Sequence, residues 1–323
     1  MIVEGFSEAE NKQNPEEPRV ALAIFIARES IEVCIKTLTA AFKATPNNSI
    51  IELLVNGNAA LASSLSRYVN QLIDVERSHE VRIWSLPLGD KANAWNIYFH
   101  QIWCNESLAF FIDGYVRLHT SSIRSLSAAV NSDLKALGGS GVPTMGRSSK
   151  NQRREMLAHG GFHGNLCCIK GSVIAELKAR SIKIPLGLYR VDSLVGAILS
   201  FDLDPSGSSW EPKRIVVVES SSWDIDAKSI FRLRDWKGKI NQIERQLRGK
   251  VENAAVKYIF TKLKFQPEQL PEEMRVVVDL WRKEDRDHYL QFMRRNPISA
   301  FVYRRHLSLA YDWSMRDIAN LIR

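Results

Sequence analysis

The sequence predicts an α/β fold, in which a mostly parallel sheet is flanked by helices and followed by a helical C-terminal extension. Three observations predict it. Short runs of branched and aromatic residues recur through the first third of the chain, as expected of buried strands. Segments with apolar residues at helical spacing separate these runs, and strands joined by helices form parallel sheets. Beyond residue 228 the pattern is helical, with Pro267 and Pro271 marking a break.

The N-terminal part of the chain alternates between the two kinds of element. Short apolar runs predict strands at 20–26, 50–55 and 108–112, the first of them buried, and a further strand is expected at 81–86. Apolar residues three and four positions apart predict helices at 29–43, 59–72 and 91–103. Residues that favour turns, such as those at 46–48 and 56–57, separate these elements.

The pattern changes after residue 131. Two glycine-rich stretches, 138–146 and 160–164, are predicted to be long functional loops. Helices at 172–180 and 192–201, a final strand at 214–218 and a helical stretch within 291–323 are expected to follow. The chain therefore divides into a disordered tail at 1–18, an α/β domain at 19–225 and a basic helical extension at 226–323.

Composition excludes several classes of protein. Hydrophobic residues make up 45% of the 323, so a wholly disordered chain is excluded. No run of about 18 apolar residues predicts a transmembrane helix, and the acidic N-terminus does not resemble a secretory signal. The four cysteines show no spacing typical of a disulfide scaffold or a zinc site. Phosphate-loop, dinucleotide and nucleophile-elbow motifs are also missing. We expect a cytoplasmic protein.

The positive charge is concentrated in one segment. Residues 228–264 contain eleven Lys and Arg against three acidic residues, which accounts for the whole net charge of +8. A local excess of this kind indicates an anionic partner, and a pyrophosphate, an anionic lipid surface and a nucleic acid are the candidates. A solvated helix face explains the same pattern equally well.

The residues that follow the predicted strands are the candidates for a binding site, because ligands of parallel sheets bind at the carboxyl ends of the strands. They are Ala27-Arg28-Glu29, Asn56-Gly57-Asn58, Gly89-Asp90-Lys91 and Asp113-Gly114-Tyr115. An aspartate directly after the apolar run 108–112 has little structural purpose, since burying a lone charge is costly.

These strand-end residues resemble the motifs of family 2 glycosyltransferases with the GT-A fold, in order and in spacing, from about residue 19 to about residue 252. The most specific match is Gly89-Asp90-Lys91-Ala92-Asn93-Ala94-Trp95-Asn96, which is similar to the family's Gly-Lys-x-x-Ala-x-Asn stretch. Asp113-Gly114-Tyr115 resembles the Asp-x-Asp motif, with Tyr115 in place of its second aspartate. The segment 160–164 and Asp192 stand where the family has an acceptor-side Gly-Gly and an acid at the start of a helix. Arg245-Gln246-Leu247-Arg248 loosely resembles a later Gln/Arg stretch.

The resemblance implies an enzyme that transfers a sugar from a nucleoside-diphosphate donor to a hydroxyl of a glycan or of a lipid-linked acceptor, with inversion, in polysaccharide biosynthesis. It implies that the donor is bound by Ala27, Arg28, Glu29, Asn56, Asn58, Lys91, Asn93 and Asp113. Asp192 would be the catalytic base, which is worth about 10²–10⁴-fold in rate. Gly161 and His163 would lie on the acceptor side, and Arg245 and Arg248 would contact the diphosphate.

The charge of the departing diphosphate has two candidate partners. A divalent cation, Mn²⁺ or Mg²⁺, is the usual one, and Asp113 is its predicted ligand. Tyr115 cannot serve as a second carboxylate, because a phenol stays protonated at neutral pH. Either Asp113 holds the metal together with diphosphate oxygens and water, or no metal takes part. In the second case Lys91, Arg245 or Arg248 would supply the positive charge.

Other readings remain open. Asp192 could cap the helix at 192–201, and Asn56 and Asn58 could serve only the turn that they occupy. A catalytically degenerate nucleotide-binding protein is suggested by Tyr115, and a sugar nucleotidyltransferase would use the same sheet. A nucleic-acid binder would act through residues 228–264, but no nucleic acid is expected as a partner. Peripheral contact with a membrane's inner face, or with a protein, would use the basic C-terminal region.

Overall fold

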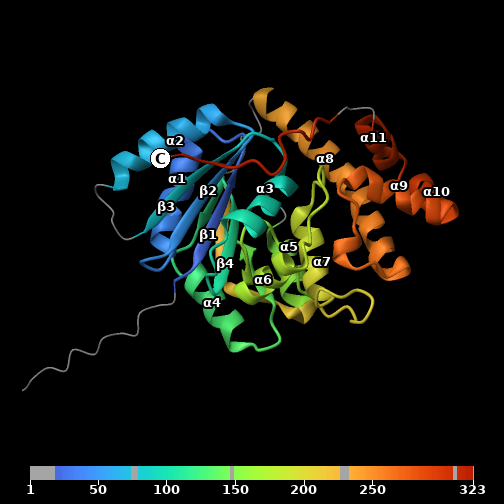
Figure 1. Cartoon of the computed structure of the whole chain (residues 1–323), viewed down its shortest axis with the longest axis horizontal. Helices are drawn as coiled ribbons and strands as arrows, with labels where there is room; N and C mark the ends of the chain where they lie inside the picture. The colour runs from blue at the N-terminus through green and yellow to red at the C-terminus, as the bar shows by residue number, and fades with distance from the viewer. Residues whose placement is uncertain (1–18, 74–78, 146–148, 226–232, 308–310, 323) are drawn as a thin grey trace, which may run out of the picture.

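The computed structural model describes residues 19–73, 79–145, 149–225, 233–307 and 311–322 (Figure 1). Within them a nine-stranded sheet, in the order β5-β8-β6-β7-β4-β1-β2-β3-β9, is covered by helices on both faces. The predicted mostly parallel sheet flanked by helices is confirmed. The tail expected at 1–18 lies outside the described residues. No helix in the described ranges is long and apolar enough to cross a bilayer.

The centre of the sheet consists of the four strands that the apolar runs predict. They are β1 (Ala21–Ile26), β2 (Ile50–Asn56), β3 (Glu80–Leu86) and β4 (Leu108–Asp113), and adjacent members of this set are parallel. The helices between them are α1 (Ile31–Ala44), α2 (Ala59–Ile73) and α3 (Lys91–Ile97), the last continuing as a π-helical turn at Tyr98–Ile102. Because these strands run the same way, the loops that follow them lie at one edge of the sheet.

Strands β1, β2 and β4 bury both faces, which explains their largely apolar sequences, whereas β3 keeps much of its length partly accessible. In β1, Ala21, Ala23 and Phe25 belong to the core that α3 helps to cover. Leu22, Ile24 and Ile26 belong to the core beneath α1, α2 and α4 (Ser122–Ser132). Helices α6 (Gly171–Ala179) and α7 (Val191–Ser200) complete the first face. Helix α5 (Ser149–His159) lies between β6 and β7 in the chain.

Each of the five remaining strands that the structure describes runs antiparallel to at least one neighbour. They are β5 (Val116–Leu118), β6 (Gly138–Pro143), β7 (Cys167–Lys170), β8 (Ile215–Ile225) and β9 (Asn320–Ile322). Strand β7 is antiparallel to β4 and β6, β5 to β8, and β9 to β3. The prediction of a final strand at 214–218 is corrected, since β8 continues to Ile225 and β9 follows it.

The glycine-rich stretch at 138–146 was expected to be a loop, and that expectation is wrong for most of its length. Residues Gly138–Pro143 form the buried strand β6. A Cβ on Gly138 would lie 2.4 Å from the carbonyl oxygen of Cys168, and one on Gly139 would lie 2.7 Å from a methyl group of Val130. The glycines therefore allow β7 and α4 to approach the strand closely, and glycine in a strand marks such an approach.

The C-terminal extension packs onto the sheet domain through helices. They are α8 (Leu233–Tyr258, continuing as a π-helical turn at Ile259–Leu263), α9 (Met274–Glu284), α10 (Arg286–Arg295) and α11 (Pro297–Leu307). The predicted break around Pro267 and Pro271 separates α8 from α9. Val251, Val277 and Trp281 share one hydrophobic core with β1 and β4. The boundary at 225/226 stays a prediction.

A helical stretch within 291–323 is expected, and the end of α10 together with α11 provides it. The residues that the structure describes after α11 are not helical. After α11 the segment 311–322 runs back across the molecule past α3 to the edge of β3, which Figure 1 shows in red. The backbone N–H of Asp317 donates to Asn93, and Lys183 forms an ion pair with Asp317. Three paired residues are too few to show the alternation by which a strand is found in a sequence, so β9 escaped prediction.

Glu52 makes the stability of the sheet depend on pH. Its side chain is 4% exposed, accepts a hydrogen bond from Trp84 at 2.6 Å and pairs with Arg82 at 3.2 Å. Burial raises the pKa of Glu52 from 4.5 to about 7, against the effects of Trp84 and Arg82. Between these two values the folded state binds more protons than the unfolded state, so stability falls as pH rises through this range.

We therefore expect the free energy of unfolding to decrease by roughly 1–3 kcal/mol between pH 5 and pH 8 through this residue alone. In the Glu52→Gln variant that component should be lost, because the amide does not titrate. Urea denaturation at both pH values measures it, with Glu176→Gln, an exposed residue of α6, as the matched control. Equal pH slopes for the wild type and for Glu52→Gln would show that Glu52 is ionised throughout.

Candidate active site

Asp113 ends β4 with both carboxylate oxygens engaged. Lys91 lies 2.5 Å from Oδ1, and the hydroxyl of Tyr115 donates to Oδ2 at 2.9 Å. The Asp113 side chain is 16% exposed. Burial and the charge of Asp113 raise the pKa of Tyr115 well above its usual value, so the phenol remains a hydrogen-bond donor. The residue that replaces the second aspartate of the motif thus binds the first one.

Lys91 is the first residue of α3, and Asp90 fixes where that helix starts. Oδ1 of Asp90 accepts the backbone N–H of Asn93 at 2.8 Å, a typical N-cap. Burial disfavours the charged form of Lys91, but the carboxylates of Asp113 and Asp192 outweigh it and raise the pKa of the amine. Lys91 therefore presents a permanent ammonium, one third exposed, beside two acidic groups.

Asp192 comes from a different part of the chain and belongs to the same cluster. It lies in the first turn of α7, where Arg190 occupies the cap position without a side-chain bond. Oδ2 of Asp192 instead accepts the backbone N–H of Gly164 at 3.0 Å. Asp192 therefore does not cap α7, which is the alternative role that the sequence allows.

The loop at 160–165 connects the two carboxylates. At one end, Oδ1 of Asn165 lies 3.2 Å from the hydroxyl of Tyr115, which binds Asp113. At the other, Gly164 donates to Asp192. The loop thus makes hydrogen bonds both to Tyr115, next to the end of β4, and to Asp192 at the start of α7. Gly161, predicted on the acceptor side, lies in the same loop and packs near Met156.

His163 lies in this loop as a neutral imidazole. Burial lowers its pKa, although Asp192 and Asp113 act in the opposite direction. Its Nδ1 accepts the backbone N–H of Asn165 at 3.2 Å, which leaves the proton on Nε2. The ring packs on Trp223 with centroids 5.0 Å apart. Such a group can donate a hydrogen bond without adding charge.

The loops after β1 and β2 are held by the side chains that the sequence assigned to the donor. Glu29 accepts the backbone N–H groups of Ala27 and Arg28, at 2.6 and 2.9 Å. Asn58 accepts from Leu61 at the start of α2 and donates to the carbonyl of Ala27. Arg28 is exposed. These hydrogen bonds fix the conformation of the loops after β1 and β2.

Asn56 and Asn93 are both buried, with different surroundings. Oδ1 of Asn93 accepts from Asp317, so this side chain holds the C-terminal segment. Oδ1 of Asn56, at the end of β2, has no hydrogen-bond partner among the described residues. A buried acceptor without a partner is costly, and a ligand at the end of β2 would satisfy it.

Arg248 holds the loop that leads to Asp192. It donates to the carbonyl of Gly187 at 2.9 Å and forms an ion pair with Glu252 at 2.8 Å. Glu252 in turn accepts the backbone N–H of Tyr189, and Asp90 accepts that of Gly187, both at 3.0 Å. We call Asp90, Arg248 and Glu252 the loop clamp. Arg245 and Arg248 also lie over the Tyr189 ring, at 5.7 and 5.8 Å.

The loop clamp was not foreseen in the sequence. Arg248 is predicted to contact the diphosphate, and its i, i+4 spacing from Glu252 is the only sign of their ion pair in the sequence. Gly249 gives a second reason for this part of α8, because a Cβ there would lie 2.9 Å from Nε of Arg190. The helix can therefore lie directly against the clamped loop.

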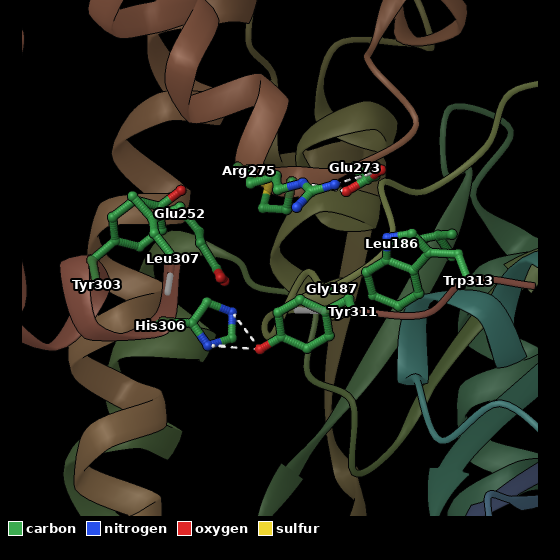
Figure 2. A pocket seen from close by; sticks show the side chains of 11 residues that line it. Leu186, Gly187, Glu252, Glu273, Arg275, Tyr303, His306, Leu307, Tyr311 and Trp313 are labelled. Carbon is green, nitrogen blue, oxygen red and sulfur yellow. Dashed lines mark hydrogen bonds and ion pairs between the residues drawn. The ribbon is translucent and has the colours of Figure 1, made fainter. Parts of the chain in front are cut away.

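A small cavity lies beside Gly187, between this loop, α11 and the C-terminal segment (Figure 2). The hydroxyl of Tyr311 lies 2.9 Å from His306, and the Tyr311 and Trp313 rings stack 5.2 Å apart. Burial and the charge of Arg248 lower the pKa of His306 to about 4. Neither Lys91, Asp113 nor Asp192 lines the cavity, so it supports the loop and is separate from the charged cluster.

The residues at the end of β4 do not fit a divalent cation. Mg²⁺ and Mn²⁺ sites in proteins require several oxygen ligands, whereas the Asp113 carboxylate is already bound by an ammonium and a hydroxyl. Nowhere in the described part of the chain do three or more His, Cys, Asp or Glu side chains form a group that could hold a metal.

The chain is similar to known proteins in structure and not in sequence. No protein-family model matches the chain, and no curated protein matches it significantly. Among solved structures, a mannosyltransferase from Pyrobaculum calidifontis, in complex with GDP-Man and Mn²⁺, superposes with a TM-score of 0.56 at 11% identity, covering 90% of this chain and 87% of that one. The fold is that of GT-A glycosyltransferases. Membership of family 2 stays a prediction.

A second structure, GalNAc-T7 with UDP, GalNAc and Mn²⁺, matches at a TM-score of 0.44 and 12% identity. The match covers 88% of this chain and 58% of that chain. At a TM-score below 0.5 this second match supports no argument, and at 11% identity the match to the mannosyltransferase shows the fold alone.

Proposed function

We propose that this protein is a glycosyltransferase that moves a sugar from a nucleoside-diphosphate donor to an acceptor hydroxyl. One observation carries the proposal: Asp113 binds the Lys91 ammonium at the carboxyl end of β4, and Asp192, from a separate element, adds its negative charge to the surroundings of that ammonium. Ligands of such sheets bind there. An ammonium suits a diphosphate, and a second carboxylate suits a proton acceptor. The GT-A fold supports the same conclusion.

The donor is assigned to the edge formed by β1, β2 and β4. Lys91 binds the diphosphate, and the unpaired oxygen of Asn56 accepts a hydrogen bond from the nucleoside. Ala27, Arg28, Glu29 and Asn58 form the wall of this site through the loop contacts described above. Asn93 contributes indirectly, by binding the backbone of Asp317. Arg245 and Arg248 also contribute indirectly, by contacting the loop at Gly187 and Tyr189.

The chemical step is a direct displacement. The acceptor oxygen attacks the anomeric carbon as the bond from that carbon to the diphosphate oxygen breaks, and its electron pair leaves with the diphosphate. Asp192 takes the proton of the attacking hydroxyl through Oδ1, because Gly164 engages Oδ2. A single displacement inverts the anomeric configuration. Neutral His163, in the loop with Gly161, orients the acceptor by donating from Nε2.

The acceptor is a glycan or a lipid-linked sugar, and contact with a membrane surface or a protein is assigned to the extension. On α11, Ile298 and Phe301 are 66% and 68% exposed, and Arg304 and Arg305 follow them. Apolar side chains beside arginines suit an anionic lipid surface. This contact stays a prediction.

Nucleotide sugars are expected to stabilise the protein against heat, because a ligand of the folded state alone raises stability by RT ln(1 + [L]/Kd), about 2.7 kcal/mol at 100 times Kd. A thermal-shift screen of UDP- and GDP-sugars measures this, with inorganic phosphate and glucose as controls. Release of free nucleoside diphosphate in the presence of an acceptor then identifies transfer.

The same screen separates the alternatives. A sugar nucleotidyltransferase would consume a nucleoside triphosphate and a sugar 1-phosphate, and would release pyrophosphate. A degenerate protein would bind the nucleotide without turnover. If no nucleotide sugar shifts the melting temperature or is turned over, the proposed function is wrong.

A further inference from the structure

The departing diphosphate needs a positive charge at one place. As the bond to the anomeric carbon breaks, the leaving group gains one unit of negative charge, and preorganised cations are the strongest means of stabilising it. The question is which group supplies that charge in this protein. The Asp-x-Asp motif that this stretch resembles has two carboxylates there, and in this chain Tyr115 occupies the second position.

The contacts of Asp113 indicate which group supplies the positive charge. The ammonium of Lys91 lies where a cation bound to Asp113 would lie, 2.5 Å from Oδ1, and Tyr115 fills the other oxygen. Asp192 is close enough to act on the same ammonium. A divalent ion would have to displace a charged amine that pairs with Asp113, and it would gain only that one carboxylate ligand in return.

The free donor capacity lies on the amine. An ammonium has three N–H groups, and a single hydrogen bond to a side-chain acceptor is described for Lys91, the one to Asp113. Its side chain is 33% exposed, so a ligand can reach it. The nitrogen can therefore keep Asp113 and donate to a diphosphate oxygen at the same time.

We infer that Lys91 takes the place of the divalent cation: its ammonium binds the donor's diphosphate, and Asp113 and Tyr115 position it. The inference rests on the proposed function and specifies how that function is achieved. Nucleotide binding and transfer are then independent of divalent metal. Asp113 acts through Lys91 and does not act as a metal ligand.

The test measures metal binding, nucleotide binding and transfer separately. Isothermal titration with UDP and GDP should give wild-type affinities that agree within about twofold in EDTA and in Mn²⁺, and transfer rates should agree equally well. Electron paramagnetic resonance should detect no Mn²⁺ bound to the wild type. Lys91→Met should lower kcat by about 10²–10³-fold, while Lys91→Arg should retain metal-independent nucleotide binding.

A gain of function provides the opposite arm. The double variant Lys91→Met/Tyr115→Asp places two carboxylates at the end of β4 without the ammonium, and it should bind Mn²⁺ and require it for nucleotide binding. Lys170→Met, a lysine that binds the carbonyl of Asp133, is the matched control and should behave like the wild type.

The inference and the proposed function fail in different ways. Mn²⁺ bound by the wild type, or nucleotide binding that EDTA abolishes and Mn²⁺ restores, would overturn the role of Lys91 and leave the glycosyltransferase standing. Wild-type kcat in a folded Lys91→Met variant would do the same. If neither nucleotide binds in EDTA or in Mn²⁺, both conclusions are wrong.

Discussion

Replacing Asp192 with asparagine is expected to lower kcat for sugar transfer by about 10²–10⁴-fold, the range that general-base catalysis supplies. The amide has almost the shape of the carboxylate, and its oxygen can still accept the N–H of Gly164, so the loop at 160–165 should keep its place. What the variant loses is the ability to take a proton. Donor affinity should therefore remain close to that of the wild type.

Initial rates at saturating donor and acceptor, with donor affinity measured by titration, separate the two effects. The matched control is Asp287→Asn, an exposed acid in the first turn of α10, which should leave both quantities unchanged. An Asp192→Asn enzyme with the kcat of the wild type would exclude Asp192 as the base. An equal loss of donor affinity would instead assign it to donor binding.

Breaking the loop clamp is expected to have the largest effect on stability. Glu252 is 1% exposed at its side chain and Arg248 is 16% exposed. Removing one partner of a buried ion pair leaves the other charge without compensation, which typically costs about 3–5 kcal/mol. Arg248→Met should therefore destabilise the fold by about that amount, and kcat should fall because the loop that carries Gly187 and Tyr189 loses its anchor.

A double variant makes this prediction sharp. In Arg248→Met/Glu252→Met both charges are gone, so the double variant should be more stable than Arg248→Met although it carries one more change. Arg245→Met is the control, because Arg245 lies over the same tyrosine ring but is exposed, and it should cost less than about 1 kcal/mol. Urea denaturation provides all three values. If Arg248→Met proved as stable as Arg245→Met, the loop clamp would make no contribution to stability.

The strand ends could be predicted because they depend on local rules. The apolar runs at 20–26, 50–55 and 108–112, with the mixed run at 81–86, give β1 to β4. Parallel strands bring their following residues to one edge, so Asp113 and Lys91 could be expected together. The position of Asp192 beside them agrees with the sequence resemblance. What the sequence could not supply was the partner of each group. In the sequence, Tyr115 indicates only the loss of a metal ligand. In the structure, its hydroxyl donates a hydrogen bond to Asp113.

The errors have a common cause, which is contact between distant residues. Gly138 and Gly139 look like a loop until β7 and α4 are packed against them. Asn93 has a partner that no local pattern shows, because the segment around Asp317 reaches it from 224 positions away. The loop clamp binds the backbone of Gly187 and Tyr189 with side chains that lie 61 to 97 positions away in the sequence. Periodicity carries no information at that range.

The return of the segment 311–322 to β3 has a consequence for the order in which the molecule is completed. Synthesis proceeds from the N-terminus, so β1 to β4 and the charged cluster leave the ribosome long before Asp317 can meet Asn93 or β9 can pair with β3. In that interval the outer edge of β3 is an open template for pairing with other chains. The nascent protein passes through a stage in which it is exposed to aggregation, and the arrival of residue 322 ends it.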